Sequence, residues 1–337
     1  MNGISFIAAK QVMVLPSKRK PKVYLAIDTP EIARLSYKLY NPFSTKGKIL
    51  KYVTRVFCIY ANSIAKLILP TLNISTSNFI SFLENELGVS LTASVYCATA
   101  GDKVVLQLVK DNEIFGYLKF PQNKKGVARL LNERKAIEKL SQLNIVPKLI
   151  YSNNYKEQPF IILKNIEGVI GEVDKAEYAN ILLKFKKPKK YLLKEHPRVL
   201  SIIAQLTSYQ LQDLAIPIQK ELNACETYFS EVYEHGDFAP WNMIRTSEGL
   251  VPFDFEYFIE IGLEFMDEIK YYFQISYLLK GIKGEALINA ISNDIKVEEI
   301  KLLICIFLLK EIVMKTSDGE VCDFERQLFL NVLNDKA

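Results

Sequence analysis

The feature that most constrains this chain is a set of three short segments rich in β-branched and aromatic residues. They are Ser94–Thr99, Lys103–Lys110 and Ile114–Phe120, and only a few residues separate each from the next. The first connection ends in Ala100-Gly101-Asp102 and the second is Asp111-Asn112, both of which are typical turn sequences. Because such short connections join strands that run in opposite directions, the segments predict a three-stranded antiparallel meander.

One helix and two further strands follow this meander. Residues Ala128–Leu143 place apolar side chains at helical spacing, namely Leu131, Ala136, Ile137 and Leu140. Val146–Tyr151 and Pro159–Leu163 are short apolar runs that predict strands. We therefore expect residues 86–167 to form a five-stranded antiparallel sheet with one helix, in the order three strands, helix, two strands.

The flanking regions are mainly helical in pattern. The lysine-rich extension before residue 86 contains Thr29-Pro30, which has the form of a helix start because Thr is a favoured N-cap and Pro a favoured first helical residue. The region after residue 167 is helical in pattern apart from a short segment near 232–256. The predicted fold class is α+β, with three regions that span residues 1–85, 86–167 and 168–337.

Two strongly apolar segments, Ile49–Leu69 and Ile300–Met314, are the candidates for a membrane span. Neither contains the ~20 uninterrupted apolar residues that a span needs. Charged residues interrupt both of them: Lys51, Arg55, Lys66, Lys301, Lys310 and Glu311. We expect each segment to be a helix buried on one side. The N-terminus, with Lys10 among its apolar residues, does not have the pattern of a signal peptide.

Composition indicates a globular chain with enough apolar residues for two cores. The chain has 337 residues, of which 49% are hydrophobic and 24% charged. Its five cysteines are scattered, with no Cys-x-x-Cys pair and no nearby histidine: Cys58, Cys97, Cys225, Cys305 and Cys322. An odd, dispersed set is typical of reduced thiols in a cytoplasmic protein and argues against a disulfide framework or a zinc site.

Basic residues cluster within one stretch of fifteen residues. They are Lys184, Lys186, Lys187, Lys189, Lys190, Lys194 and Arg198, in a chain of net charge +5. The simplest interpretation is a solvated helix–loop–helix junction broken by Pro188. The alternatives are attraction to an anionic acceptor or to an anionic membrane surface. Nothing in the sequence has the pattern of a nucleic-acid recognition helix or an aromatic basic sheet, so no nucleic-acid partner is expected.

The residues most informative about chemistry lie in His235-Gly236-Asp237 and in the two short stretches that follow it. Asn242 comes five positions after Asp237, and Asp254 comes twelve positions after Asn242. A carboxylate such as Asp237 can orient a hydroxyl acceptor and take its proton, while Asn242 and Asp254 offer the oxygen ligands that Mg²⁺ prefers. The spacing predicts phosphoryl transfer. We expect His235 to support the loop and not to catalyse.

Glu256 follows Asp254 by two residues. It is a possible further metal ligand, directly or through water, or a hydrogen-bonding partner of the catalytic loop.

This segment resembles the signature of the aminoglycoside phosphotransferase and choline kinase group of the protein-kinase-like fold. That signature is His-Gly-Asp, four intervening residues, Asn and then an aspartate-led metal motif, and the resemblance spans roughly Leu91 to Leu279. It implies a bilobal protein with a nucleotide-binding N-lobe over 86–167. It also implies a mainly helical C-lobe that carries a catalytic loop at 235–242 and a metal motif at 254–256. The helical N-terminal extension lies outside it.

The same resemblance calls for a lysine on the third strand and a glutamate on the helix. Lys119 lies on the third predicted strand and Glu133 on the predicted helix. Independently of any family, a lysine among apolar strand residues needs a counter-charge, because an unpaired buried charge is costly. Glu133 is the expected partner, and Lys119 would hold the α- and β-phosphates. The alternative is a strand-end lysine that points to solvent.

The passage Ile161–Gly168 resembles the connection where the adenine ring bonds to backbone, so Lys164, Asn165 and Ile166 are the expected adenine contacts. The loop expected to cover the phosphates departs from the family pattern, because Ala98–Asp102 has one glycine and one acidic residue. The metal motif lacks the glycine of protein kinases, and no activation-segment signature follows it, which argues against a protein substrate.

The resemblance thus implies an ATP- or GTP-dependent, Mg²⁺-dependent kinase of a small-molecule hydroxyl, such as a sugar, an aminoglycoside-like compound or an amino alcohol. The alternative is a pseudokinase that acts as a binding module. A variant of the first hypothesis is a kinase recruited to anionic lipid by cations on an apolar helix: Lys48, Lys51, Arg55 and Lys66. A group of acidic residues either faces a cationic acceptor or forms the polar face of a helix: Glu260, Glu264, Asp267 and Glu268.

Overall fold

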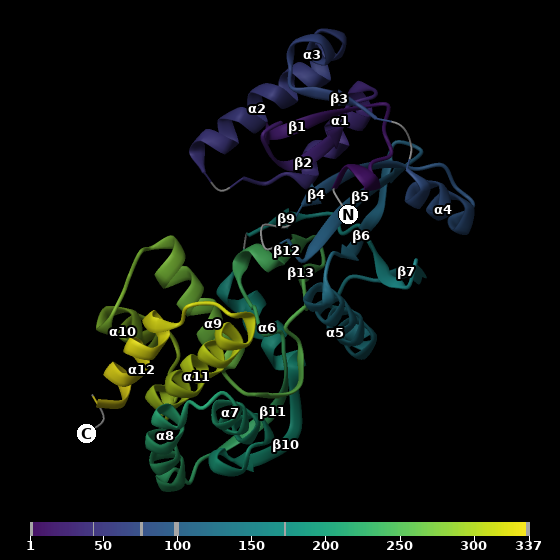
Figure 1. Cartoon of the computed structure of the whole chain (residues 1–337). Coiled ribbons are helices and arrows are strands. Elements are labelled where there is room, and N and C mark those ends of the chain that lie inside the picture. The colour runs from purple at the N-terminus through teal and green to yellow at the C-terminus, as the bar shows by residue number, and fades with distance from the viewer. Residues whose placement is uncertain (1–2, 43, 75–76, 98–100, 172, 335–337) are drawn as a thin grey trace. The chain divides into compact units, whose positions relative to one another are not determined.

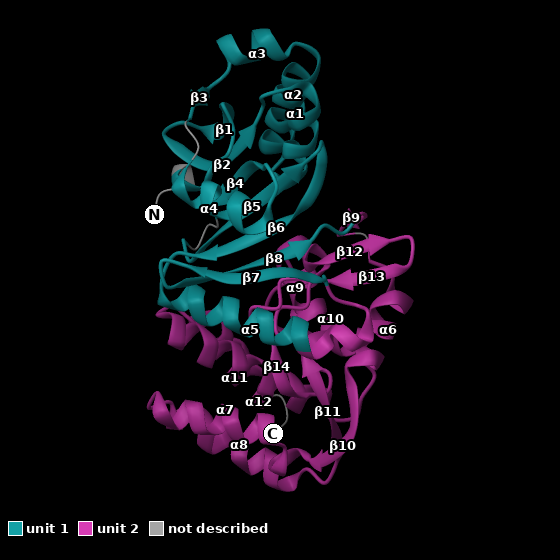
Figure 2. Cartoon of the chain, turned by 90° about the vertical axis from the view of Figure 1, so that its right-hand side faces the viewer, with its two compact units in different colours: residues 1–138, 147–166 teal, residues 139–146, 167–337 magenta. Residues whose placement is uncertain are grey.

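The computed structural model of the protein describes residues 3–42, 44–74, 77–97, 101–171 and 173–334 (Figure 1). The chain divides into two compact units. Unit 1 contains residues 1–138 and 147–166, and unit 2 contains residues 139–146 and 167–337 (Figure 2).

Unit 1 is built on one antiparallel sheet of eight strands, in the order β3-β1-β2-β4-β5-β6-β8-β7. The last five strands in this order are the ones expected from the sequence. They are β4 (Thr92–Cys97), β5 (Lys103–Lys110), β6 (Glu113–Pro121), β8 (Gln158–Lys164) and β7 (Leu149–Tyr155). The expected helix is α5 (Lys124–Leu140), which is followed by the short turn η3 (Ser141–Leu143). The predicted mixed fold class is therefore confirmed.

The extension differs from the expectation because it adds three strands to this sheet. They are β1 (Gln11–Ser17), β2 (Lys20–Ala26) and β3 (Thr71–Asn73), and β2 pairs directly with β4. The expected helical part is present as well: η1 (Gly3–Phe6), α1 (Pro30–Ser36), η2 (Tyr37–Leu39), α2 (Thr45–Tyr60), α3 (Asn62–Ile68) and α4 (Asn78–Leu87). Residues 1–85 are thus part of unit 1 and not a separate body.

The strands of the extension escaped the sequence analysis because both of their faces are buried. Along β1, Val12 and Val14 belong to one apolar cluster, whereas Met13 and Leu15 belong to another. Alternate residues of a strand point to opposite faces of the sheet, so the two clusters lie on opposite faces. A strand buried on both faces has a continuous apolar sequence, which periodicity alone cannot distinguish from a buried helix.

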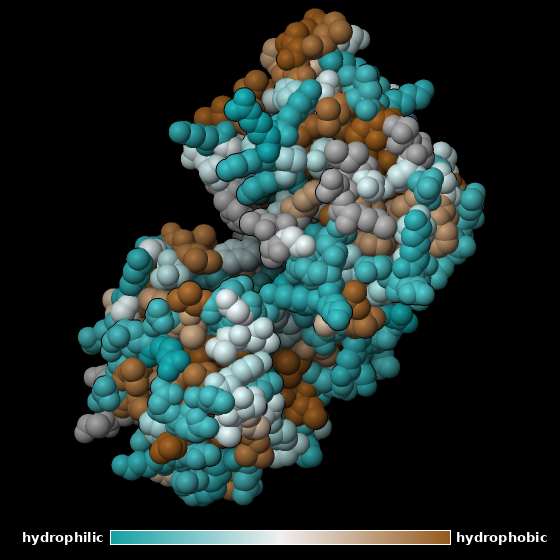
Figure 3. Space-filling view, in the orientation of Figure 1, coloured by the Kyte–Doolittle hydropathy of each residue, from teal (hydrophilic) through white to brown (hydrophobic). Residues whose placement is uncertain are grey.

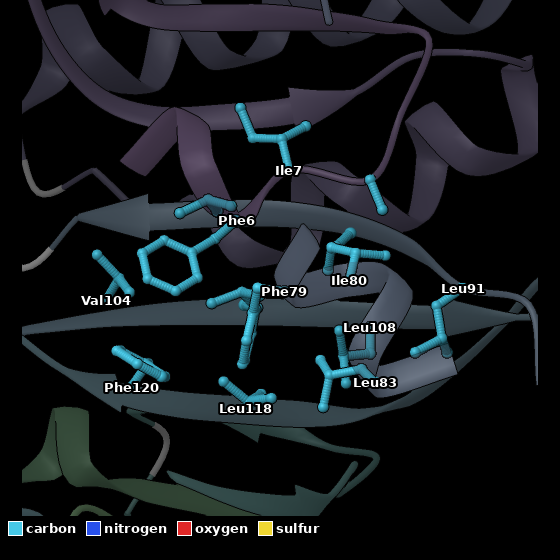
Figure 4. Packing of buried hydrophobic residues seen from close by; sticks show 14 of the residues in the cluster. Phe6, Ile7, Phe79, Ile80, Leu83, Leu91, Val104, Leu108, Leu118 and Phe120 are labelled. Atoms are coloured by element: carbon cyan, nitrogen blue, oxygen red, sulfur yellow. The ribbon is translucent and has the colours of Figure 1, made fainter. Parts of the chain in front are cut away.

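Aromatic side chains hold η1 and α4 against the strands expected from the sequence. Phe6 of η1, Phe79 of α4 and Phe120 of β6 are all buried, and their ring centroids lie 4.9–5.2 Å apart. Figure 4 shows Phe6 above Phe120, with Phe79 beside them. Edge-to-face and tilted packing of this kind adds a little to the free energy gained from burying the rings. This core fixes the strand that carries Lys119.

Unit 2 combines helices with two small antiparallel sheets. The first sheet has the order β10-β11-β14 and the second β13-β12-β9. Their strands are β9 (Val169–Ile170), β10 (Lys186–Leu192), β11 (Tyr228–Glu234), β12 (Met243–Thr246), β13 (Gly249–Pro252) and β14 (Ile259–Leu263). The helices and helical turns are α6 (Lys175–Phe185), η4 (Leu193–Glu195), α7 (Pro197–Ser208), α8 (Gln212–Ala224), η5 (Pro240–Asn242), α9 (Met266–Gln274), the π-helical turn η6 (Ile275–Leu279), α10 (Glu285–Asp294), α11 (Ile300–Asp318) and α12 (Asp323–Asn334).

The basic cluster corrects the expectation of a helix–loop–helix junction, because most of it lies on strand β10. Carboxylates of neighbouring elements pair with four of its seven cations: Lys186 with Glu264, Lys187 with Glu231, Lys194 with Glu226 and Arg198 with Glu234. Glu231 of β11 and Glu264, directly after β14, compensate two of the four lysines of β10, which no local pattern shows. Ion pairs within unit 2 therefore compensate much of the positive charge of this cluster.

Of the two most apolar segments, 300–314 differs from the expectation of burial on one side, whereas helix α2 of the segment 49–69 is buried on one face, as expected. Helix α11 is buried around its whole circumference, from Leu302 to Val313. The segment 49–69 forms α2 and α3 and leaves several large apolar side chains exposed. None of the helices in the described part of the chain combines the length and the apolar content that a membrane crossing requires.

Candidate active site

Strand β11 ends directly before the His235-Gly236-Asp237 loop, so the middle strand of a three-stranded sheet positions this loop. Gly236 has a φ of +84°, and a Cβ atom there would lie 2.3 Å from the carbonyl oxygen of Tyr257. Both the left-handed backbone and the close approach exclude a side chain. The loop therefore requires glycine at this position.

A buried carboxylate of helix α9 anchors the same loop. The backbone N–H groups of His235 and Gly236 donate to Asp267 Oδ2 and Oδ1, at 2.6 and 2.9 Å. Burial and the nearby Glu234 raise the pKa of Asp267 to about 7, against the opposing effect of these two donors. Asp267 thus belongs neither to a cationic-acceptor surface nor to the polar face of a helix, the two interpretations that the sequence had left open.

His235 connects the loop to the segment before Asp254. Its Nε2 lies 3.0 Å from the carbonyl oxygen of Phe253, and its Nδ1 lies 3.3 Å from the amide nitrogen of Asp237. Since a carbonyl oxygen only accepts and a backbone N–H only donates, Nε2 carries the proton and Nδ1 accepts. The ring is fully buried and is committed to two backbone contacts.

Three side chains surround the carboxylate of Asp237, which is 29% exposed. Asn242 Nδ2 donates to Oδ2 at 2.9 Å and also to the Asp237 carbonyl at 2.9 Å. Gln274 Nε2 donates to Oδ1 at 3.4 Å, and the ammonium of Lys270 lies 3.6 Å from the same oxygen. These contacts fix the orientation of the carboxylate and leave part of it accessible to solvent.

The hairpin of β12 and β13 brings Asn242 next to the residue before Asp254. Met243 pairs with Pro252 at the open end of the hairpin, so Asn242 lies opposite the segment that leads to Asp254. The N–H of Phe253 donates to the Asn242 carbonyl at 2.9 Å. Asp254 itself has a φ of +67°, a left-handed conformation that is uncommon for a residue with a side chain and that clusters at functional sites.

The chemistry of these donors fits Mg²⁺. Because Asn242 gives its amide nitrogen to Asp237, its amide oxygen is the atom left for a metal, and Asp254 adds carboxylate oxygens. Glu256 lies two residues further on and is half-buried. No group of three or more His, Cys, Asp or Glu side chains that could hold a metal ion occurs among the described residues. A magnesium site here would therefore need oxygens from a nucleotide, as is usual for this ion.

A chain of buried charges of alternating sign leads away from Asp237 through unit 2. Lys270 of α9 binds Glu311 of α11 at 2.8 Å, and Glu311 lies 3.4 Å from Lys310. Lys310 in turn lies 3.2 Å from Glu234, which also pairs with Arg198 of α7 at 3.3 Å. Each charge thus has a neighbour of opposite sign, as buried charges require.

The pKa values of three members of this network, Lys270, Glu234 and Glu311, move in the direction of full ionisation. Burial disfavours the charge of Lys270, but the carboxylates of Glu311 and Asp237 outweigh it and raise the pKa of Lys270. Burial likewise opposes the charges of Glu234 and Glu311, and the neighbouring cations nonetheless lower the pKa of both. The sequence analysis missed the network because residues in contact within it are up to 76 positions apart. The charged Lys310-Glu311 pair within an apolar helix was the available signal.

In unit 1, Lys119 and Glu133 form the expected ion pair. Lys119 Nζ of β6 donates to both carboxylate oxygens of Glu133 on α5, at 2.6 and 2.8 Å, and both side chains are buried. The alternative of a strand-end lysine that points to solvent is therefore wrong.

The acidic residue in the β4–β5 connection also has a partner within unit 1. Asp102 is buried and pairs with Arg129 of α5, so its carboxylate is compensated. Ala98, Thr99 and Ala100, the rest of the connection singled out in the sequence, lie outside the described residues.

The segment predicted to contact adenine follows β8. The N–H of Lys164 donates to the carbonyl of Lys148 at 2.8 Å, so this amide is engaged within the sheet. Asn165 and Ile166 come after the strand and are half-buried. The backbone groups of these two residues are therefore the better candidates.

The antiparallel sheet with its Lys–Glu pair, and the helical unit with its His-Gly-Asp loop, define a protein-kinase-like fold. No protein-family model matches the sequence, and a search of curated proteins gave no match. Among solved structures, a thermostable mutant of aminoglycoside phosphotransferase APH(4)-Ia in complex with ADP and hygromycin B is similar, with a TM-score of 0.56 and 10% sequence identity over 77% of this chain and 99% of that chain.

Two further structures of that enzyme give the same result. A complex with AMP-PNP and hygromycin B has a TM-score of 0.56 and 9% identity over 78% of this chain and 99% of that chain. The apo form has a TM-score of 0.52 and 10% identity over 77% and 99%. At this identity the likeness shows the fold: the chain has the protein-kinase-like fold of the aminoglycoside phosphotransferases.

Proposed function

We propose that this protein transfers the γ-phosphoryl group of ATP or GTP to a hydroxyl group of a small molecule. The observation that carries the proposal is the Asp237 carboxylate, which Asn242, Gln274 and Lys270 orient while it stays partly exposed. A general base must be held in place and must also be reachable by the acceptor, and this carboxylate meets both requirements.

Asp237 acts in this proposal as the base that orients the acceptor hydroxyl and takes its proton. His235 does not take part in the proton transfer, because both of its ring nitrogens are bound to backbone groups. Its task, with Asp267, is to hold the loop. Pre-positioning of this kind is the main contribution that a protein makes to phosphoryl transfer.

Asn242 and Asp254 would hold Mg²⁺, with Glu256 as a possible third contributor. When bound, the ion would neutralise charge on the phosphate oxygens. The close connection between Asn242 and Phe253 supports a shared role for Asn242 and Asp254, since the hairpin couples their positions. The backbone strain at Asp254 supports a functional role for that residue.

Lys119 would bind the α- and β-phosphates, and Glu133 would orient its ammonium group. The adenine ring would contact the backbone of the Lys164–Ile166 segment, chiefly at Asn165 and Ile166. Two of the structures of similar fold contain ADP or AMP-PNP, which favours ATP as the donor.

The acceptor is proposed as a sugar, an aminoglycoside-like compound or an amino alcohol. Hygromycin B is present in two of the structures of similar fold, which supports a polyhydroxylated acceptor. All five cysteines are free thiols, which supports the cytoplasm as the compartment.

The test is a transfer assay with labelled ATP or GTP, Mg²⁺ and a panel of sugars, aminoglycosides and amino alcohols. The wild-type protein should label at least one acceptor, and Asp237→Asn should not. Asp294→Asn is the matched control, because Asp294 is an exposed aspartate of α10 that pairs only with Lys175 in the described contacts. Nucleotide binding without transfer to any acceptor would favour the pseudokinase alternative.

A further inference from the structure

Helices α2 and α3 expose an unusual amount of apolar surface. Tyr60 is 80% and Leu67 86% exposed, and neither contributes to a core of unit 1. The large apolar side chains exposed on the two helices are Ile49, Tyr52, Val53, Phe57, Tyr60, Ile64, Leu67 and Ile68. Figure 3 shows this apolar surface over α3 and along α2. We call these eight residues the α2–α3 patch.

Helix α2 has two apolar faces, of which unit 1 uses only one. Thr54 and Cys58, four positions apart, are buried against the sheet. On the opposite side Ile49, Val53 and Tyr60 recur at spacings of four and seven, which places them along one line of the helix. A surface helix normally has polar residues on that side. The outer face therefore has the composition of a contact surface.

The charged residues on the two helices are all basic. Neither α2 nor α3 contains an acidic residue, whereas the two helices contain five basic ones: Lys46, Lys48, Lys51, Arg55 and Lys66. Residues 1–73 carry twelve Lys or Arg and two Asp or Glu, a net charge of +10 in a chain whose total is +5. The positive charge of the protein is thus concentrated around the patch, and the rest of the chain is net negative.

We propose that the α2–α3 patch docks onto the surface of an anionic membrane. The tyrosines, the aliphatic side chains and the flanking cations are the combination that an interfacial helix uses: apolar groups enter the boundary of the acyl chains while lysines and arginines meet anionic headgroups. Tyrosine suits this position because its ring is apolar and its hydroxyl stays hydrated.

The same charges disfavour a second copy of the chain as the occupant. Two patches in a symmetric dimer would bring two regions of net charge +10 together, which electrostatic repulsion opposes. An anionic bilayer offers both an apolar interior and the complementary charge. Docking through unit 1 does not depend on catalysis, so the proposal stands or falls separately from the proposed phosphotransferase activity.

The test is flotation of the full-length protein with vesicles of phosphatidylcholine alone or with one-third phosphatidylglycerol. Binding should be strong only to the anionic vesicles. It should weaken at least tenfold between about 0.1 M and about 1 M salt, since the Debye length falls from about 10 Å to about 3 Å. Lys48→Ala combined with Arg55→Ala should weaken binding roughly 30-fold, on the basis of two lost basic contacts.

A second variant, Tyr60→Ser with Leu67→Ser, removes apolar contacts at positions so exposed that the fold should not change, and it should lose at least tenfold in binding. The matched control is Ile216→Ser with Val321→Ser, which changes side chains that are 67% and 76% exposed in unit 2, and it should bind as the wild type does.

Absence of binding to anionic vesicles would overturn the proposal, as would equal binding by the wild type and both patch variants. A dimer in light scattering that Tyr60→Ser with Leu67→Ser converts to monomer would instead assign the patch to self-association. Loss of vesicle binding in the patch variants, with the control unaffected, would establish the docking surface.

Discussion

Each unit contains a buried lysine–glutamate ion pair, and the two pairs differ in the elements that they join and in their further contacts. Lys119 and Glu133 lie fourteen positions apart and join one strand to the next helix. Lys270 and Glu311 lie 41 positions apart and join two packed helices, and Lys270 also reaches Asp237. In the proposed phosphotransferase, the same chemistry would serve two tasks: the first pair would hold a cation in place for a phosphate, and the second would support the base.

The largest effect on activity is expected from substitution of Asp237, the proposed base that Lys270 of the second pair contacts. Asp237→Ala should lower kcat by about 10² to 10⁴-fold, the contribution of a positioned general base, while nucleotide affinity stays close to that of the wild type. Steady-state kinetics with a calorimetric measurement of nucleotide binding separates the two quantities. Asp294→Ala should change neither, and a normal turnover in Asp237→Ala would remove Asp237 from its assigned role.

A smaller loss is expected from the first pair. Lys119→Ala should lower kcat/KM for the nucleotide by roughly 10²-fold, because it removes one charged contact to the phosphates. Lys110→Ala is the control, since Lys110 is a half-exposed lysine at the end of the neighbouring strand. Unchanged KM and kcat in Lys119→Ala would show that the pair in unit 1 is only structural.

Substitution of Lys270 should lower the stability of the folded protein. Among the described residues, Lys270→Met leaves the buried Glu311 with Lys310, at 3.4 Å, as its cation, and should lower the free energy of unfolding by about 3 kcal/mol. Lys270→Met combined with Glu311→Gln should recover most of this loss, because no uncompensated charge remains. Urea unfolding measures both variants. Full stability of Lys270→Met alone would mean that the network does not need its central cation.

The smallest change, taken per unit of pH, concerns the carboxylate that anchors the loop. The pKa of Asp267 is raised from 3.8 to about 7, so the folded state holds a proton that the unfolded state releases. Its contribution to stability is complete below pH 3.8 and is lost as the pH rises to about 7, with a slope of at most about 1.4 kcal/mol per pH unit.

Asp267→Asn should flatten this slope, because an amide does not titrate in this range. Thermal unfolding followed from acidic to neutral pH measures the difference between the variant and the wild type. An identical pH dependence in both proteins would show that Asp267 is already ionised throughout that range.

Local patterns were sufficient for the parts of the fold that consecutive elements form. Strands β4, β5 and β6 and the helix after them lie within one stretch of about fifty residues, so their spacing predicted them. The Lys119–Glu133 pair in the same stretch was expected from the family resemblance and from the need of a buried lysine for a counter-charge. The His-Gly-Asp loop and Asn242 were also visible, because the hairpin that places Asn242 is local. Their roles in catalysis stay predictions.

The rest depends on contacts between distant segments. Strands β1 and β2 are buried on both faces and have no alternating pattern, so they were hidden within the extension. Strand β10 contains four lysines, which hide its strand character in the sequence. Glu231 of β11 and Glu264, directly after β14, pair with two of them. Asp267 and Lys270 contact the His-Gly-Asp loop although they lie 31 or more positions further along the chain.

The measurement that tests the central claim most directly is a calorimetric titration with ATP and with GTP, in the presence and absence of Mg²⁺, on the wild type and on Asp254→Ala. The account predicts binding of at least one nucleotide that depends on Mg²⁺ and that Asp254→Ala loses. Asp294→Ala, a substitution of the same kind on the surface of α10, should bind as the wild type does. Absence of binding to either nucleotide by the folded wild-type protein would contradict the proposed phosphotransferase.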